Sequence, residues 1–185
     1  MKTMKIVKSN RKTFSLEVKR DGSVILRAPI FASNRQIEEF YNKKKAWLEK
    51  HIIENEKRTE ESRSYPAFTE DKIKALKVRA KQYIPKRVEY WAEIIGVKYN
   101  SVSIRAQKTR WGSCSSKGNL NFNCLLMLTD TEDIDYVVIH ELCHIKELNH
   151  SKRFWSLVEA YMPNYKEVQK HIKSMETEIF SRFEK

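Results

Sequence analysis

Three of the five histidines of this sequence stand within eleven residues, together with a glutamate. His140 and His144 are four apart, so on a helix their imidazoles share one face and can bind the same divalent ion. Glu141 stands next to His140, where its carboxylate can accept a proton from a water molecule on that ion. The spacing predicts a zinc site that performs hydrolysis, with Glu141 as its catalytic base.

A catalytic zinc site needs a third protein ligand and an open fourth position. His150 follows His144 by six residues, and Asn149 just before it tolerates the left-handed conformation that turns a chain back at a helix end. We expect His150 to be the third ligand of one zinc ion per chain, with Glu147 or a more distant carboxylate as the alternative. Zinc lowers the pKa of its water to near neutrality, and Glu141 then takes the proton and delivers it to a leaving group.

Spacing defines the substrate contacts less well than the metal ligands. A residue that stabilises the developing oxyanion is needed, and the spacing does not select among three candidates: Arg110, Tyr161 and Tyr165. The predicted strand at 120–124 precedes the metal helix and offers an edge to which an extended peptide adds as another strand. Asn121 and Asn123 would then lie near the substrate, or they are ordinary exposed strand residues.

Two other functions remain open. The first is metal-dependent hydrolysis of a nucleotide, as by a pyrophosphatase, although the sequence has neither a phosphate-binding loop nor a carboxylate cluster suited to magnesium. The second is a non-catalytic, nucleic-acid-associated module in which zinc only stabilises the fold. Such a module needs a fourth protein ligand, for which Cys143 and Cys114 are the candidates. On a regular helix Cys143 points away from the metal face, which leaves Cys114.

The helix that carries these histidines is predicted to lie in the core. Thr129 and Glu132 form a capping-box pattern that begins it, and it extends to about Leu148. Apolar residues surround His140 and His144 on nearly every side, so little of the helix faces solvent. Buried imidazoles and carboxylates without partners cost several kcal/mol, and a bound metal ion offsets that cost.

The remaining elements indicate an α+β fold. Periodicity predicts strands at 99–106 and 120–124, and helices at 152–161 and 164–183. Near the N-terminus, the Asp21-Gly22 pair predicts a β-hairpin, followed by long helices at about 34–58 and 69–95. The polar stretch 57–65 has the composition of a linker. It divides the chain into a hairpin-plus-helix region at 1–66 and a hydrolase domain at 67–185, unless the two form one compact unit.

The composition excludes several classes of protein. With 41% hydrophobic and 11% aromatic residues among 185, the chain is too apolar to be disordered. It has no run of about 18 apolar residues that would cross a membrane, and its N-terminus lacks the apolar segment of a secretory signal. Three cysteines, an odd number, argue against a disulfide framework. We therefore expect a cytoplasmic protein that does not act at a membrane.

The net charge of +12 is unevenly distributed. Residues 1–66 carry 16 basic and 9 acidic side chains and residues 67–110 carry 11 and 4, whereas residues 111–185 carry 9 and 11. A basic surface over the first 110 residues attracts polyanions such as nucleic acid, or it simply keeps the protein soluble. The predicted partners are thus a peptide or protein substrate and, through the basic part, nucleic acid.

These motifs closely resemble those of the YgjP-like metallopeptidase family, with a more distant likeness to SprT-like and WLM zincins. The resemblance rests on the stretches 110–114, 118–123, 140–144, 149–151 and 154–155. It implies a zincin-like fold with a small, mostly antiparallel sheet and an active-site helix, and zinc held by His140, His144 and His150. Glu141 corresponds to the family's catalytic base.

The resemblance also bears on the substrate. Some members of the family carry a nucleotide pyrophosphatase label, and related enzymes that cleave DNA-bound proteins combine a zincin centre with nucleic-acid binding. The stretch 111–114, Trp-Gly-Ser-Cys, is a family signature, and we expect it to support the sheet edge. Glu147 stands where metzincins have glycine and no Met-turn is evident, so the resemblance does not extend to metzincins.

Overall fold

The chain divides into two compact units. The computed structural model describes residues 4–19 and 22–183, and for residues 58, 59 and 61–64 it describes the backbone. Residues 1–64 form the first unit and residues 65–185 the second, and each has its own buried apolar cluster. The boundary lies two residues from the one expected from the polar stretch at 57–65.

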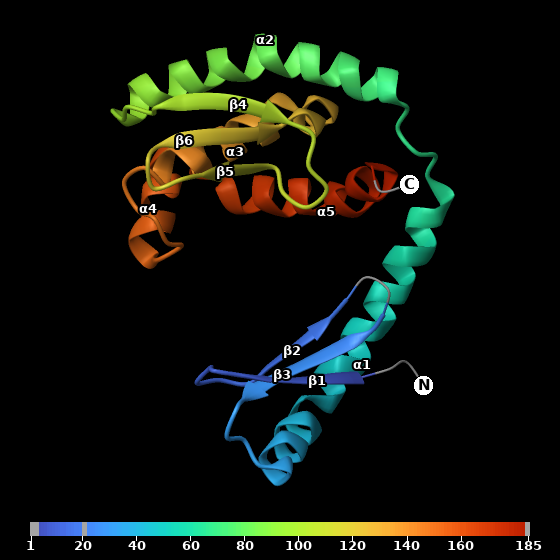
Figure 1. Ribbon diagram of the computed structural model, residues 1–185. Helices are drawn as coiled ribbons and strands as arrows, with labels where there is room; N and C mark the ends of the chain where they lie inside the picture. The colour runs from blue at the N-terminus through green and yellow to red at the C-terminus, as the bar shows by residue number, and fades with distance from the viewer. Residues whose placement is uncertain (1–3, 20–21, 184–185) are drawn as a thin grey trace. The chain divides into compact units, whose positions relative to one another are not determined.

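The first unit is a three-stranded sheet with one helix (Figure 1). Its strands β1 (Met4–Ser9), β2 (Ser15–Val18) and β3 (Val24–Pro29) lie in the order β1-β3-β2. Strands β2 and β3 pair antiparallel, as the predicted hairpin requires, and Gly22 supplies a positive φ of 76° in its turn. Asp21, the other predicted turn residue, lies outside the described residues. A small core forms where Leu26 and Ala28 of β3 meet Ile37 of the helix.

Helix α1 (Asn34–Ser64) is longer than expected. Ser33 caps it, since its hydroxyl accepts a hydrogen bond from the backbone N–H of Gln36 at 3.3 Å. The prediction that 57–65 is a linker was wrong over 57–64. Those residues contain no glycine or proline and several good helix formers, so the helix continues until Pro66 approaches.

The second unit packs four helices around a second three-stranded sheet. Helix α2 (Glu70–Ile95) has Thr69 as its N-cap, whose hydroxyl accepts a hydrogen bond from the backbone N–H of Lys72. Gly96 follows its last residue and adopts the left-handed conformation. Strands β4 (Ser101–Arg105), β5 (Gly112–Cys114) and β6 (Asn119–Asn123) follow, then a short 3₁₀ turn, η1 (Cys124–Leu128). Helices α3 (Thr131–Cys143), α4 (Lys152–Tyr161) and α5 (Tyr165–Phe183) complete the chain.

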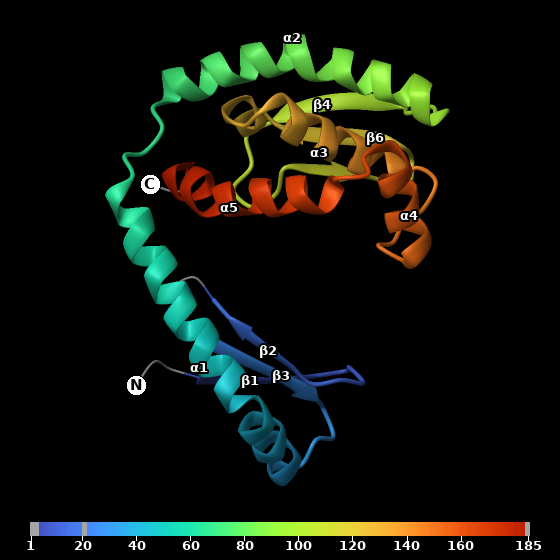
Figure 2. The ribbon, with the colours of Figure 1, turned by 180° about the vertical axis from the view of Figure 1, so that it is seen from behind.

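The strand order β4-β6-β5 differs from the sequence order, so β4 and β5 are the edge strands of this sheet and β6 is central. Strand β6 carries the fully buried Leu120 and Phe122, and it pairs on both sides, parallel to β4 and antiparallel to β5. The sheet is therefore mixed and not mostly antiparallel, because β6 returns between two strands that precede it. Helix α3 lies on one face of this sheet, flanked by α2 and α5 (Figures 1 and 2).

Helix α3 starts and ends differently from the prediction. Its N-cap is Asp130, whose N–H donates to the Asp133 carboxylate at 3.3 Å, whereas Thr129 ends η1. Its last residue is Cys143, not Leu148, because the chain then turns and carries His150 back. The α+β fold class is confirmed. No helix among the described residues combines the length and apolarity that crossing a membrane requires.

Candidate active site

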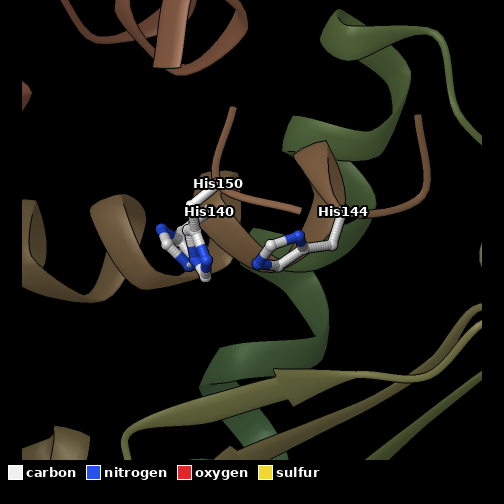
Figure 3. A group of neighbouring side chains, drawn as sticks. All are labelled: His140, His144 and His150. Carbon is white, nitrogen blue, oxygen red and sulfur yellow. Dashed lines mark hydrogen bonds between the residues drawn. The ribbon is translucent and has the colours of Figure 1, made fainter. Parts of the chain in front are cut away.

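Helix α3 and its C-cap residue carry two histidines and a glutamate within a buried apolar framework. Val138, Ile139 and Leu142 are completely buried, so the helix is fixed against the rest of the second unit. His140 and His144 project from it, and His150 approaches from the loop that follows (Figure 3). The helix thus presents the side chains from a rigid element, which suits a site that must hold its geometry.

The three imidazoles converge. One ring nitrogen of each lies within 4.8 Å of the others, and Nε2 of His150 is 3.0 Å from Nε2 of His140 (Figure 3). The Nδ1–H of His144 donates to the carbonyl oxygen of Glu147 at 3.0 Å. Because a carbonyl only accepts, this bond leaves Nε2 of His144 with its lone pair free for another partner.

Burial favours the neutral form of His140 and His144. Burial, reinforced by the neighbouring His144 and His150, lowers the pKa of His140 from 6.5 to about 3. Burial also lowers the pKa of His144. Neutral imidazole is the form that coordinates metals. The buried Nδ1 of His140 has no hydrogen-bond partner among the described residues.

The loop between α3 and α4 positions His150. The side-chain carbonyl of Asn149 accepts a hydrogen bond from the backbone N–H of Ser151 at 3.1 Å, and Ser151 caps α4. The ring of Trp155 stacks on His150 with centroids 5.6 Å apart. Glu147, the alternative ligand, directs its carboxylate to Arg153 at 2.8 Å. His150 is the residue that the structure brings to the other two histidines.

Glu141 is buried beside strand β5. Its exposed fraction is 6%, and burial raises its pKa from 4.5 to about 8, while the positive charge of Arg110 acts in the opposite direction. A Cβ placed on Gly112 would lie 2.8 Å from both Cγ and Oε1 of Glu141. The glycine of the Trp-Gly-Ser-Cys stretch therefore provides the space that this glutamate occupies.

Of the residues predicted to contact the substrate, Arg110 lies at the site and Asn123 does not. Arg110 lines the cleft that also contains His140 and Glu141. Asn123 is completely buried, and its amide donates to the carbonyl oxygens of Gln107 and Arg110 at 2.8 and 2.9 Å. It holds the loop before β5 in place and is not available to a substrate.

The remaining candidates also make internal contacts. Asn121 lies on β6, and its amide donates to the hydroxyl of Ser113 at 3.4 Å. The prediction that this strand has an open edge was wrong, since β6 is the central strand. The hydroxyl of Tyr161 donates to the Ile95 carbonyl at 3.5 Å, and the ring of Tyr165 stacks on Trp155.

A cleft of about 610 Å³ opens beside Glu141 and His140. One wall comes from residues 109–112, and the other from helix α5 with Lys166, Lys170 and Lys173. The sequence interpretation missed this wall. The three lysines stand at i, i+4 and i+7, so a shared helix face was readable, but the same spacing is typical of a helix that simply faces solvent.

Comparison with known proteins decides the family. The model of the family described as "YgjP-like, metallopeptidase domain" matches residues 12–75 and 66–175. The chain belongs to the YgjP-like metallopeptidase family. The resemblance seen in the sequence is thereby confirmed, and a metallopeptidase requires a divalent metal.

Two solved structures resemble part of this YgjP-like chain. The metallopeptidase zymogen abylysin of Pyrococcus abyssi is 29% identical, with 49% of this chain and 92% of that one covered and a TM-score of 0.46. The zymogen jannalysin of Methanocaldococcus jannaschii is 23% identical, with 49% and 94% covered and a TM-score of 0.44. A search of the curated proteins gives no match.

Proposed function

We propose that this protein is a zinc-dependent metallopeptidase in which His140, His144 and His150 hold one zinc ion per chain and Glu141 is the general base. The observation that carries the proposal is the convergence of three imidazoles beside a buried glutamate. We place this activity in the cytoplasm, which suits the free thiols of Cys114, Cys124 and Cys143.

The three histidines fit a zinc ion. Ligands at about 2.0 to 2.1 Å in a tetrahedral site are about 3.3 Å apart. The Nε2 atoms of His140 and His150, at 3.0 Å, are close to that spacing. Among the described residues, the ligand cluster around His140 contains no thiol or carboxylate. The site thus has the three-ligand composition of a catalytic centre, which argues against the non-catalytic module.

Zinc bound there would make a water molecule more acidic and polarise the carbonyl of the bond to be cleaved. Glu141 is placed to move the proton. Burial raises its carboxyl pKa to about 8 despite the opposing charge of Arg110, and the charge of a zinc ion bound beside it would favour the ionised form that accepts a proton. Glu141 accepts the proton of the attacking water and returns it to the leaving amine.

The open edge of the sheet supports binding of an extended peptide. Asn123 N–H donates to the Trp111 carbonyl at 2.7 Å, and Ser115 N–H donates to the Asn119 carbonyl at 3.0 Å. Backbone groups alternate in direction along a strand, so those of Gly112 and Cys114 point away from β6. A peptide that pairs with this edge of β5 would lie beside Glu141.

Metal analysis and one substitution test the proposal. Purified protein should contain about one zinc per chain. Glu141→Gln should keep the zinc and the fold but lose hydrolysis of an unstructured protein such as casein. A wild-type chain that folds and binds no zinc, or a Glu141→Gln variant with full activity, would refute it.

A further inference from the structure

The cleft beside Glu141 is basic on two sides. Arg110 lies on the wall before β5, and Lys166, Lys170 and Lys173 lie on the wall formed by α5. All four side chains belong to exposed residues. Within the part of the chain that the structure describes, none of the four forms an ion pair.

Two carboxylates also line this cleft, against its four cations. Glu176 accepts a hydrogen bond from Nε1 of Trp111 at 3.1 Å, and Glu141 is buried. The cleft therefore presents an excess of positive charge directly beside the candidate site.

Two stacked aromatic rings, Tyr165 and Trp155, connect Lys166 to the metal ligands. The Nζ of Lys166 lies 5.6 Å from the centroid of the Tyr165 ring, which stacks on Trp155 at 5.3 Å. Trp155 in turn contacts the rings of His140 and His150 at 5.8 and 5.6 Å. A substrate group held by Lys166 would therefore lie in the same cleft as His140 and Glu141.

We infer that this cleft selects peptide substrates carrying carboxylates next to the scissile bond, with Arg110, Lys166, Lys170 and Lys173 as the specificity-determining residues. The inference rests on the proposed peptidase function and names its substrate class. The carboxylate comes from aspartate or glutamate side chains or from a free C-terminus. Long-range attraction to these lysines weakens as salt is added, because the cations are exposed.

The spacing of the cations favours a peptide over a nucleotide. Lys166 and Lys170 are separated by about 6 Å along the helix axis. Side chains on one face of an extended peptide repeat at about 6.6 Å. Acidic residues at alternate positions therefore match Lys166 and Lys170. The wall formed by residues 109–112 contains one glycine and is no glycine-rich loop of the kind that encloses a triphosphate.

Binding to an inactive enzyme tests the inference without turnover. Zinc-loaded Glu141→Gln is titrated with a labelled extended peptide that has glutamates at alternate positions and an amidated C-terminus, and with the same peptide carrying glutamines. We expect the glutamate peptide to bind about tenfold more tightly at low salt, with the preference lost at about 0.5 M salt. In the background of Glu141→Gln, the charge reversals Lys170→Glu and Lys173→Glu together should abolish or invert the preference.

The matched control is Lys81→Glu, which reverses an exposed lysine of α2 outside the cleft and should leave the preference unchanged. Equal affinity for the two peptides, or a preference that survives the double reversal, would overturn the inference. The glutamine peptide with a free C-terminus distinguishes the two carboxylate sources. UTP is the last arm: tighter binding of UTP than of either peptide, lost in the double reversal, would assign the cleft to phosphate and overturn the inference.

Cleavage assays with wild-type enzyme separate this inference from the proposed function. Cleavage of the glutamine and glutamate peptides at equal rates leaves the peptidase standing and removes the acidic specificity. If the glutamate peptide binds selectively but no peptide is cleaved, the carboxylate-binding cleft is supported and the peptidase proposal fails.

Discussion

Gly112 and Glu141 occupy adjoining space, so that a methyl group on the first would lie 2.8 Å from two atoms of the second. The contact joins the edge strand β5 to the helix that carries the histidines. It also gives the Trp-Gly-Ser-Cys stretch a role in the site itself, beyond the support of the sheet edge that the sequence suggested.

Gly112→Ala should displace Glu141 while leaving the zinc ligands in place. The backbone of Gly112 has no positive φ, so alanine meets no conformational penalty there and the effect comes from the clash alone. A misplacement of about 1 Å at a catalytic group costs about 100-fold, and we expect a loss in kcat of that order. Zinc content and kcat are the measurements. Ser116→Ala, at an exposed position in the same hairpin, is the control, and equal kcat values for the two variants would contradict this account.

Asn123→Ala should destabilise the second unit far more than Asn121→Ala. Asn123 is completely buried and its amide donates to two carbonyls, while its Oδ1 accepts from the N–H of Leu125 at 3.2 Å. Its loss leaves buried backbone groups unsatisfied, at about 2 to 4 kcal/mol. Asn121 makes one hydrogen bond at 3.4 Å, so its removal should cost less than about 1 kcal/mol. Urea denaturation of both variants measures the difference, and similar losses would refute the assignment.

These two asparagines show where sequence reasoning stops. They are two residues apart on one strand, and the alternation of apolar and polar residues treats them alike. Asn123 is buried and Asn121 is not because of the strands that pair with β6 and the loop that folds over its end. Such long-range contacts leave no local pattern in the sequence. Local patterns did suffice for the β2–β3 hairpin and for the helix of the His-Glu-x-x-His motif, because turn chemistry and helical periodicity are local. Binding of nucleic acid by the basic first 110 residues stays a prediction.

The pair formed by His171 and Asp133 should make stability depend on pH. Nδ1 of His171 lies 3.0 Å from both carboxylate oxygens of Asp133, and this hydrogen bond, with the carboxylate's charge, raises the pKa of His171 above 6.5. Because the folded state then binds the proton more tightly than the unfolded state, the contribution is complete below pH 6.5 and is lost as the pH rises through the raised pKa. Asp133 is 38 residues from His171 in the sequence, so no local pattern indicates this pair.

His171→Gln isolates this effect. The lowered pKa values of His140 and His144 act in the opposite direction and destabilise the folded state as the pH falls, in wild type and variant alike. The difference in unfolding free energy between the two proteins should therefore be largest near pH 5.5 and shrink by pH 8.5. Urea titrations at both values give it, and a difference that grows with pH would show that the pair does not carry the stabilisation.

His150→Gln and Glu147→Gln should separate the two candidates for the third ligand. Nε2 of His150 is 3.0 Å from that of His140, whereas the carboxylate of Glu147 pairs with Arg153 and its backbone carbonyl accepts from His144. Changes to residues that only orient metal ligands cost about 10- to 100-fold in affinity, so loss of a ligand should cost more than about 100-fold. His150 is exposed, and its substitution should leave the metal-free protein as stable as wild type. Competition with a zinc-binding dye measures the affinities. A large loss in Glu147→Gln with little change in His150→Gln would transfer the ligand role to the glutamate and leave the imidazole of His150 as a neighbour of the metal.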